Sequence, residues 1–208
     1  MRLCMFHPVG HPLERGWVGR VDGDRVIQLA AQTLQSFFSG GGTAREHAEY
    51  PLAEVRLLAP VLHPPSVRLF DDQDSFTFAN PAAIVGPGAL VGVPRSTLTV
   101  HRRLAAVIGA EGAIGGFTIL AEWRTRGIGP PKDRDFALGL GPVVVTPDEV
   151  SLPTGFDWAA AVAFAARHTL LYPGDVLAGP ASEPRLVEDG HVGIEIEGVG
   201  TLEQRVAD

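Results

Sequence analysis

The most informative segment of the chain is Val100-His101-Arg102-Arg103-Leu104-Ala105-Ala106-Val107-Ile108-Gly109. From Leu104 onward it is a short apolar run that ends at a glycine, which is typical of a buried β-strand. A histidine and two arginines stand directly before this run, and such residues are rarely buried without a partner. The segment therefore predicts a core strand with charged side chains at its start, and it marks His101 and Arg103 as candidate functional residues.

The rest of the chain continues this pattern of short strands. Its 25 glycines and 17 prolines indicate many turns. Trp17–Val21 and Arg25–Leu29 alternate on either side of Asp22-Gly23, which predicts a hairpin. Further apolar segments bounded by Gly or Pro lie at residues 55–60, 83–86, 104–109, 114–120, 141–146, 174–178 and 191–199.

Few helices are expected. The sequence allows a short one within residues 30–38, and Asp157 is suited to cap a second over residues 157–168. Together these elements predict a mainly β or α+β fold. We expect a small N-terminal β-rich domain over residues 1–55 and a larger, mainly β domain over residues 56–208.

Composition excludes several classes of function. The chain of 208 residues is 45% hydrophobic and carries a formal charge of −7, which argues against a nucleic-acid partner because phosphate binding needs clustered basic side chains. No apolar run approaches the ~20 residues of a membrane span, and the first residues lack the apolar core of a signal peptide. Cys4 is the single cysteine, so no internal disulfide is possible. A cytoplasmic protein is expected.

Six segments, in this order along the chain, resemble the fumarylacetoacetate hydrolase-like family. They are the Val18–Leu29 hairpin, the linker VRLLAPVLHPP at residues 55–65, the strand at 100–109, the segment KDRDFALGLGP at 132–142, TLLYPGDV at 169–176 and GVGTL at 198–202. The resemblance implies a mixed β-sandwich or rolled-sheet fold and a homodimer. It also implies a small oxo-acid or β-dicarbonyl ligand, with hydrolase or lyase chemistry. The domain at 56–208 is shortened relative to the pattern of this family.

The residues that carry the chemistry of this family are altered. The family writes the strand at 100–109 as YExELAVVIG, where two glutamates and a later aspartate bind Mg²⁺. In this chain those positions fall on His101, Arg103 and Glu122. A guanidinium has no lone pair for a metal, and one carboxylate is too few for a hard cation. The aspartate and histidine that activate water fall on Leu69 and Phe76. Because the metal ligands are lost, no metal cofactor is expected.

Two interpretations of this change remain open from the sequence, so whether the chain is an enzyme is uncertain. In the first, the old pocket is closed: Arg103 pairs with Glu122 in place of the metal, Phe76 and Leu69 add packing, and the protein is a non-catalytic pseudoenzyme that binds a ligand or partner. In the second, the pocket is repurposed for metal-independent isomerase, cyclase, decarboxylase or lyase chemistry. The residues that this reading proposes are His101, Glu122 and Lys132 for catalysis, and Arg103, Arg126 and Asp135 for substrate binding. A metal-dependent C–C bond hydrolase is a third alternative.

Overall fold

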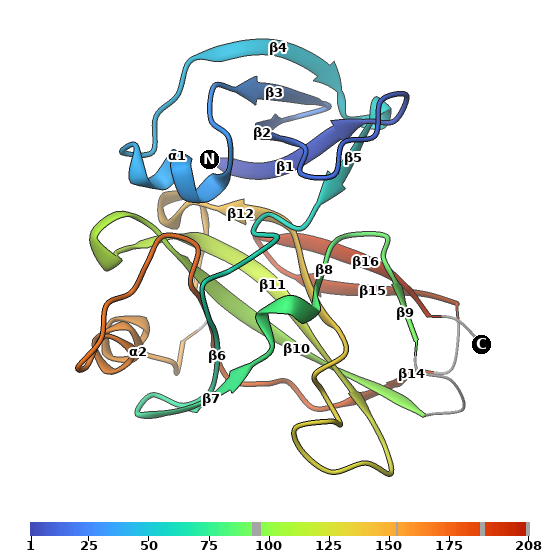
Figure 1. Ribbon diagram of the computed structural model, residues 1–208, viewed down its shortest axis with the longest axis vertical. Helices are drawn as coiled ribbons and strands as arrows, with labels where there is room; N and C mark the ends of the chain where they lie inside the picture. The colour runs from blue at the N-terminus through green and yellow to red at the C-terminus, as the bar shows by residue number, and fades with distance from the viewer. Residues whose placement is uncertain (93–96, 153, 188–189, 207–208) are drawn as a thin grey trace.

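The computed structural model describes residues 1–92, 97–152, 154–187 and 190–206. Two sheets and two short α-helices make up the fold (Figure 1). The long strands β10 (Leu98–Ile108) and β11 (Ile114–Thr125) run through the middle of the molecule, with the N-terminal strands gathered at one end. In the view of Figure 1, α2 (Trp158–Ala165) lies on one side of these strands and β15 (Gly190–Ile196) and β16 (Gly200–Val206) lie on the other.

The larger sheet has 13 strands and is mixed. Its main path follows the order β4-β3-β2-β1-β12-β11-β10-β13-β6-β7, while β5, β8 and β14 pair at its sides. The bounds not yet given are β1 Arg2–Pro8, β2 Trp17–Asp22, β3 Arg25–Leu29, β4 Glu46–Pro51, β5 Val55–Leu58, β6 Val67–Asp72, β7 Ser75–Ala79, β8 Ile84–Val85, β9 Leu90–Val91, β12 Leu138–Val145, β13 Val176–Ala178 and β14 Arg185–Val187. Four 3₁₀ turns, at Leu52–Glu54, Pro81–Ala83, Ala110–Gly112 and Pro147–Glu149, complete the described elements together with α1 (Leu34–Ser39).

Side-chain alternation along β10 and β11 divides the core into two layers. On one face, Leu104, Ala106 and Ile108 join Phe117 and Trp123 in a cluster that also packs against α2 and β15–β16. On the other face, alternate residues such as Ala105 and Val107 of β10 and Leu120 of β11 pack with β12, β6 and α1. Because both faces are covered, the two strands read as nearly continuous apolar runs.

The two helices begin at side-chain caps. The Thr33 hydroxyl accepts a hydrogen bond from the Ser36 amide at 3.0 Å, and Asp157 accepts one from the Ala160 amide at 3.0 Å. These caps satisfy amides that have no partner inside a helix. The expected capping role of Asp157 is confirmed, although both helices are shorter than residues 30–38 and 157–168.

The smaller sheet, β15-β16-β9, is joined to the larger one by the buried side chain of Gln204. Its amide oxygen accepts a hydrogen bond from the Trp123 indole at 2.7 Å. A Cβ at Gly139 would lie 2.3 Å from the same oxygen, so only glycine leaves room for the amide. This contact explains why residue 139 of β12 is a glycine.

The mainly β fold with few helices is confirmed. The strands expected at 104–109 and 114–120 are parts of the much longer β10 and β11, and the segment at 191–199 contains β15 and the turn that follows it. The hairpin over Val18–Leu29 is also present, as β2 and β3. The division into residues 1–55 and 56–208 stays a prediction, since β1 pairs with β12 and the sheet runs on from one part to the other. No helix among the described residues is long and apolar enough to cross a membrane.

Cys4 on β1 is fully buried, and burial raises the pKa of its thiol to about 12. Because the thiolate is the nucleophile, the folded protein should not react with a disulfide reagent at pH 8. We expect labelling by 5,5′-dithiobis(2-nitrobenzoate) to follow the fraction unfolded in a urea titration. Rapid stoichiometric labelling without urea would contradict the buried position of this strand.

Candidate functional site

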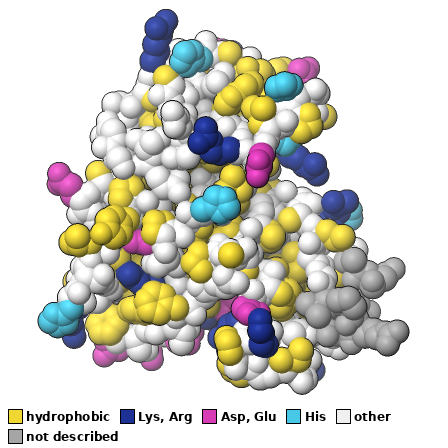
Figure 2. Space-filling view, in the orientation of Figure 1, with side chains coloured by type: hydrophobic (Ala, Val, Ile, Leu, Met, Phe, Trp, Pro, Cys, Tyr) yellow, Lys and Arg dark blue, Asp and Glu magenta, His cyan; other side chains and the backbone are white. Residues whose placement is uncertain are grey.

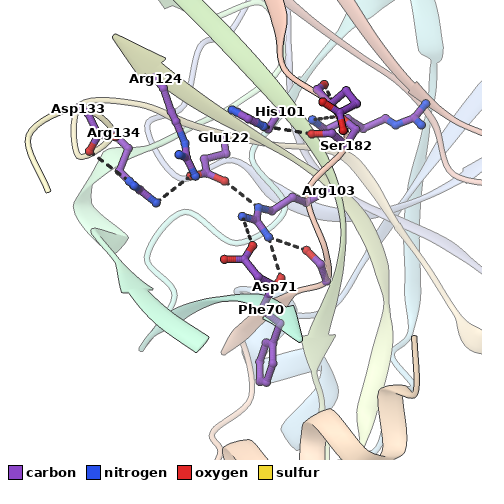
Figure 3. A network of polar contacts seen from close by, with 12 residues as sticks. Phe70, Asp71, His101, Arg103, Glu122, Arg124, Asp133, Arg134 and Ser182 are labelled. Atoms are coloured by element: carbon purple, nitrogen blue, oxygen red, sulfur yellow. Dashed lines mark hydrogen bonds and ion pairs between the residues drawn. The ribbon is translucent and has the colours of Figure 1, made fainter. Parts of the chain in front are cut away.

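The charged residues at the start of β10 lie on one face of the central hairpin. His101 stands directly opposite Glu122 of β11, and Arg103 stands opposite Leu120. Residues two apart on a strand share a face, so Arg103 is the diagonal neighbour of Glu122 on this face. Figure 3 shows the Arg103 and Glu122 side chains pointing toward one another from the two strands. The side-chain positions therefore follow from the register.

Arg103 is almost fully buried, and each of its nitrogens has a partner. Its Nε donates to Glu122 Oε2 at 2.7 Å, and its Nη2 contacts Asp71 Oδ1 at 3.1 Å. Its Nη1 donates to the carbonyl oxygens of Phe70 and Gly179, both at 2.8 Å. The guanidinium thus joins β10 to β11, to the β6 strand and to the segment after β13 (Figure 3). The sequence-based expectation that Arg103 pairs with Glu122 is confirmed.

Glu122 is fully buried and is surrounded by arginines. Its Oε1 accepts from Arg124 Nη2 at 2.6 Å and from Arg124 Nε at 2.8 Å, and it lies 3.4 Å from Arg134 Nη1. The loop after β11 supplies Arg134, whose Nε also contacts Asp133 Oδ1 at 3.2 Å. Three guanidinium groups therefore share one carboxylate. We call Arg103, Arg124, Arg134 and Glu122 the arginine cluster.

Only part of the arginine cluster reaches solvent. The side chains of Arg124 and Arg134 are 27% and 22% exposed, whereas those of Arg103 and Glu122 are 1% and 0% exposed. His101, on the same face of the hairpin, is half-buried, and its Nδ1 lies 3.1 Å from the Ser182 carbonyl oxygen. With the proton on Nδ1 donated to that carbonyl, Nε2 carries a lone pair.

The other residues proposed from the sequence lie apart from this cluster. Lys132 is exposed and pairs with Asp135 Oδ2 at 2.8 Å. Arg126 is also exposed, and its backbone amide donates to the Thr97 carbonyl. Among the described residues, no hydrogen bond or ion pair connects any of these three side chains to Arg103 or Glu122. Their catalytic and substrate-binding roles therefore stay predictions.

The donor set does not fit a hard cation such as Mg²⁺. Oxygen ligands are needed, and the one carboxylate at the centre already accepts hydrogen bonds from three arginines. The described residues contain no group of three or more His, Cys, Asp or Glu side chains that could hold a metal. The positive charge that a metal would supply is instead supplied by Arg103. No step of a reaction is assigned to a metal.

The positions of the family's water-activating pair are part of the core. Leu69 is buried, and Phe76 packs its ring against Phe70, with a centroid distance of 5.2 Å. Neither Arg103 nor Glu122 lines any of five cavities along the described residues, although Asp71, which contacts Arg103, lines one of them. The geometry thus favours a closed centre over an open pocket around Arg103.

Sequence reasoning missed Asp71, Arg124, Arg134 and Ser182 as neighbours of the centre. Arg124 could have been found, because it lies two residues from Glu122 on the same strand and so on the same face. Asp71 lies near the end of β6, which extends through Asp72. Arg134 comes from a loop whose path carries no periodic signal.

Comparisons with known proteins match the first part of the chain to a family model and the whole chain to solved structures of the same fold. Residues 1–60 match the family model for the N-terminal domain of Rv2993c-like proteins. No curated protein matches the chain. Among solved structures, the maleylpyruvate hydrolase from Sphingobium sp. SYK-6 in complex with manganese(II) and pyruvate is 22% identical with a TM-score of 0.80, and the match covers 99% of this chain and 98% of that one.

Two further structures share the fold. A 2-keto-3-deoxy-D-arabinonate dehydratase complexed with magnesium and 2,5-dioxopentanoate is 19% identical, with a TM-score of 0.79. The 2-hydroxyhepta-2,4-diene-1,7-dioate isomerase from Mycobacterium marinum is 25% identical, with a TM-score of 0.74. Each match covers 99% of this chain and 98% of the other. One fold thus carries hydrolase, dehydratase and isomerase names, so the activity has to be argued from the residues of the site.

Metal ions should not stabilise the protein. A cation held at ~100-fold above its dissociation constant would add about 2.7 kcal/mol to the free energy of unfolding. For a chain of this size, that would raise the melting temperature by several degrees. We expect equal melting temperatures in millimolar Mg²⁺, in millimolar Mn²⁺ and in EDTA by differential scanning calorimetry. A clear rise with either cation would mean that the arginine cluster opens to admit it.

The Arg103→Met variant should be strongly destabilised, because it leaves Glu122 Oε2 and two buried carbonyl groups without a donor. Removing one member of a buried ion pair costs about 3–5 kcal/mol of unfolding free energy. Arg124 and Arg134 still face Glu122, so we expect a value near the lower end. The Arg103→Met/Glu122→Leu double variant should recover part of this loss. Urea denaturation of both variants measures the difference.

A matched control separates this effect from a general loss of charge. Lys132→Met removes a cation from an exposed ion pair and should change the unfolding free energy by less than about 1 kcal/mol. If Arg103→Met is no more destabilising than this control, the buried guanidinium does not hold β10, β11, β6 and the segment after β13 together in solution.

Proposed function

We propose that this protein binds a small oxo-acid anion without a metal and that it is a non-catalytic pseudoenzyme of the fumarylacetoacetate hydrolase-like fold. The observation that carries the proposal is the saturation of Arg103, which makes contacts to Glu122, Asp71 and two carbonyl groups. A guanidinium with a partner at each of its three nitrogens and 1% of the side chain exposed presents no accessible donor to a substrate. Arg103 supplies the positive charge that a metal would supply, but it offers no open coordination position to a substrate.

Binding is assigned to the solvent-facing side of the arginine cluster. Arg124 and Arg134 are part-exposed there, and a guanidinium edge recognises a carboxylate through charge-assisted hydrogen bonds. His101 lies on the same face and has a free Nε2 when Nδ1 donates to Ser182. Two structurally similar proteins are complexed with pyruvate and with 2,5-dioxopentanoate, which supports an oxo-acid as the class of ligand.

A second function is favoured by the geometry of His101. A histidine whose Nδ1 is fixed by a carbonyl presents Nε2 as a base, and such a group can remove a proton next to a ketone. In this alternative the part-exposed arginines stabilise the enolate that forms. The reaction is an enolisation without a metal, in which Nε2 removes the proton and returns it at a different atom, so that the product is an isomer.

Pyruvate binding in EDTA tests the first proposal. We expect isothermal titration calorimetry to detect binding to the unmodified protein and a loss of at least tenfold in affinity for Arg134→Met. Of the two part-exposed arginines, Arg134 makes the longer contact with Glu122, 3.4 Å against 2.6 Å for Arg124. The Arg134→Met variant therefore keeps the ion pairs of Glu122 with Arg103 and Arg124. Arg45→Met, which alters an exposed arginine in the loop before β4, is the matched control and should bind as the unmodified protein does. Binding that needs Mn²⁺ would overturn the metal-free proposal.

Exchange of the pyruvate methyl protons for deuterium distinguishes the two functions. In D₂O with EDTA, a non-catalytic protein leaves the exchange rate, followed by proton NMR, at the value of the buffer. An enolising enzyme raises that rate, and His101→Gln should then lower it by about 10²-fold or more. A raised rate that survives His101→Gln would exclude His101 as the base.

A further inference from the structure

A separate cavity lies where the N-terminal strands meet the rest of the chain. It has a volume of about 640 Å³, which is within the range of small-molecule sites. Its lining combines Met5 of β1, the residues Glu14 and Arg15 of the β1–β2 loop, Thr33 and Gln35 at the start of α1, and Pro60, Leu62 and His63 of the segment after β5. None of these residues belongs to the arginine cluster.

The floor of this cavity is apolar and its rim is charged. Met5 and Pro60 are buried and Leu62 is half-buried, whereas Glu14 and Arg15 are exposed. Figure 2 shows basic, acidic and histidine side chains beside hydrophobic ones across the middle of one face of the molecule. An apolar floor with a few polar groups at the edge is the usual construction of a small-molecule site.

The charged groups at the rim make no polar contact with another described residue. No hydrogen bond or ion pair of the described residues involves the side chain of Glu14 or Arg15. The larger cavity of about 780 Å³ beside β10 keeps only the Glu197 carboxylate without a hydrogen bond or ion pair among the described residues. There, Arg102 donates to the Glu195 carbonyl, and Glu149 pairs with the N-terminal ammonium group. The rim of the 640 Å³ cavity therefore keeps both of its charges available to a ligand.

The loop that carries these charges is anchored close to them. Gly16 adopts a positive φ of 69°, and a Cβ there would lie 2.5 Å from the Phe6 carbonyl oxygen, so the chain is pressed against β1 directly after Arg15. At the other end of the loop, the Val9 amide donates to the Glu54 carbonyl at 2.8 Å. Across the cavity, the side-chain amide of Gln35 donates to the His63 carbonyl oxygen at 3.5 Å. The walls are thus formed before a ligand arrives, which reduces the entropy cost of binding.

We propose that this cavity binds an α-amino acid with an apolar side chain. Arg15 contacts the ligand carboxylate, Glu14 contacts its ammonium group, and Met5, Pro60 and Leu62 cover its side chain. A zwitterion matches the two adjacent opposite charges, while an anion alone would be repelled by Glu14. The apolar part of the ligand gains from leaving water at the buried floor. This site is independent of the oxo-acid site proposed above.

Calorimetry with three related compounds tests the proposal on the full chain. L-Leucine has both charges, 4-methylpentanoate lacks the ammonium group, and 3-methylbutylamine lacks the carboxylate. We expect L-leucine to bind and each of the other two to bind at least tenfold more weakly, because each loses one charge-assisted contact. The absence of any heat with 10 mM L-leucine, or equal affinity for all three compounds, would overturn the proposal.

Two variants assign the roles of the charged residues. Arg15→Gln should lower the affinity for L-leucine at least tenfold without lowering the affinity for 3-methylbutylamine, and Glu14→Gln should have the same effect on L-leucine while raising the affinity for 4-methylpentanoate, which Glu14 repels. Both residues are exposed, so neither change should prevent folding, and Arg45→Gln is the control for a lost surface charge. Unchanged affinity for L-leucine in both variants would place the binding elsewhere.

Discussion

A charged group at the centre of a sheet is tolerated only where partners replace the water that it loses, and the Arg103 guanidinium depends on this condition. Transfer of an unpaired ion into the interior costs several kcal/mol, and the attraction of a single partner does not always offset it. Here Glu122 balances the charge, while two carbonyl oxygens and Asp71 contact the other two nitrogens. Since Arg103 and its acceptors come from four separate segments of the chain, burial of one side chain fixes the relative positions of β10, β11, β6 and the segment after β13.

The same contacts explain how a cation and a guanidinium can exchange places in one fold. Both place positive charge beside a buried carboxylate, so the strands keep the same electrostatic reason to stay together. They differ in what remains available to a substrate. A bound metal can keep an open coordination position and polarise a carbonyl group, whereas a buried guanidinium with a partner at each nitrogen has no accessible position for a new ligand. The fold can therefore persist while the chemistry changes.

Much of the fold could be predicted because local signals and buried patterns agree in it. Asp22-Gly23 between alternating segments predicted the β2–β3 hairpin, and Asp157 predicted the start of α2. The lengths of β10 and β11 could not be predicted, because His101, Arg102 and Arg103 interrupt the apolar pattern although the strand continues through them. Tertiary pairing of Arg103 with Glu122 overrides the local preference of this arginine for the surface, whereas Arg102 stays exposed.

The candidate centre was predictable to the extent that strand geometry determines it. The pairing of Arg103 with Glu122 followed from the resemblance together with the need to neutralise a buried charge. Lys132 shows the limit of this reasoning, since it occupies a position that matches the family pattern and yet pairs with Asp135 at the surface. Its place depends on the path of an irregular loop, which no periodicity in the sequence encodes. The same holds for Arg134, which the loop brings to Glu122.

Charged groups that are paired inside the protein and charged groups that face solvent lie in different parts of the molecule. At the centre, donors and acceptors are matched within the protein, so a ligand that entered would have to break existing contacts. At the solvent-facing side of Arg124 and Arg134, and at Glu14 and Arg15 in the N-terminal cavity, polar groups are accessible without such a loss. Recognition by this protein is therefore expected at the margins of the large sheet, where a ligand replaces water and not another part of the chain.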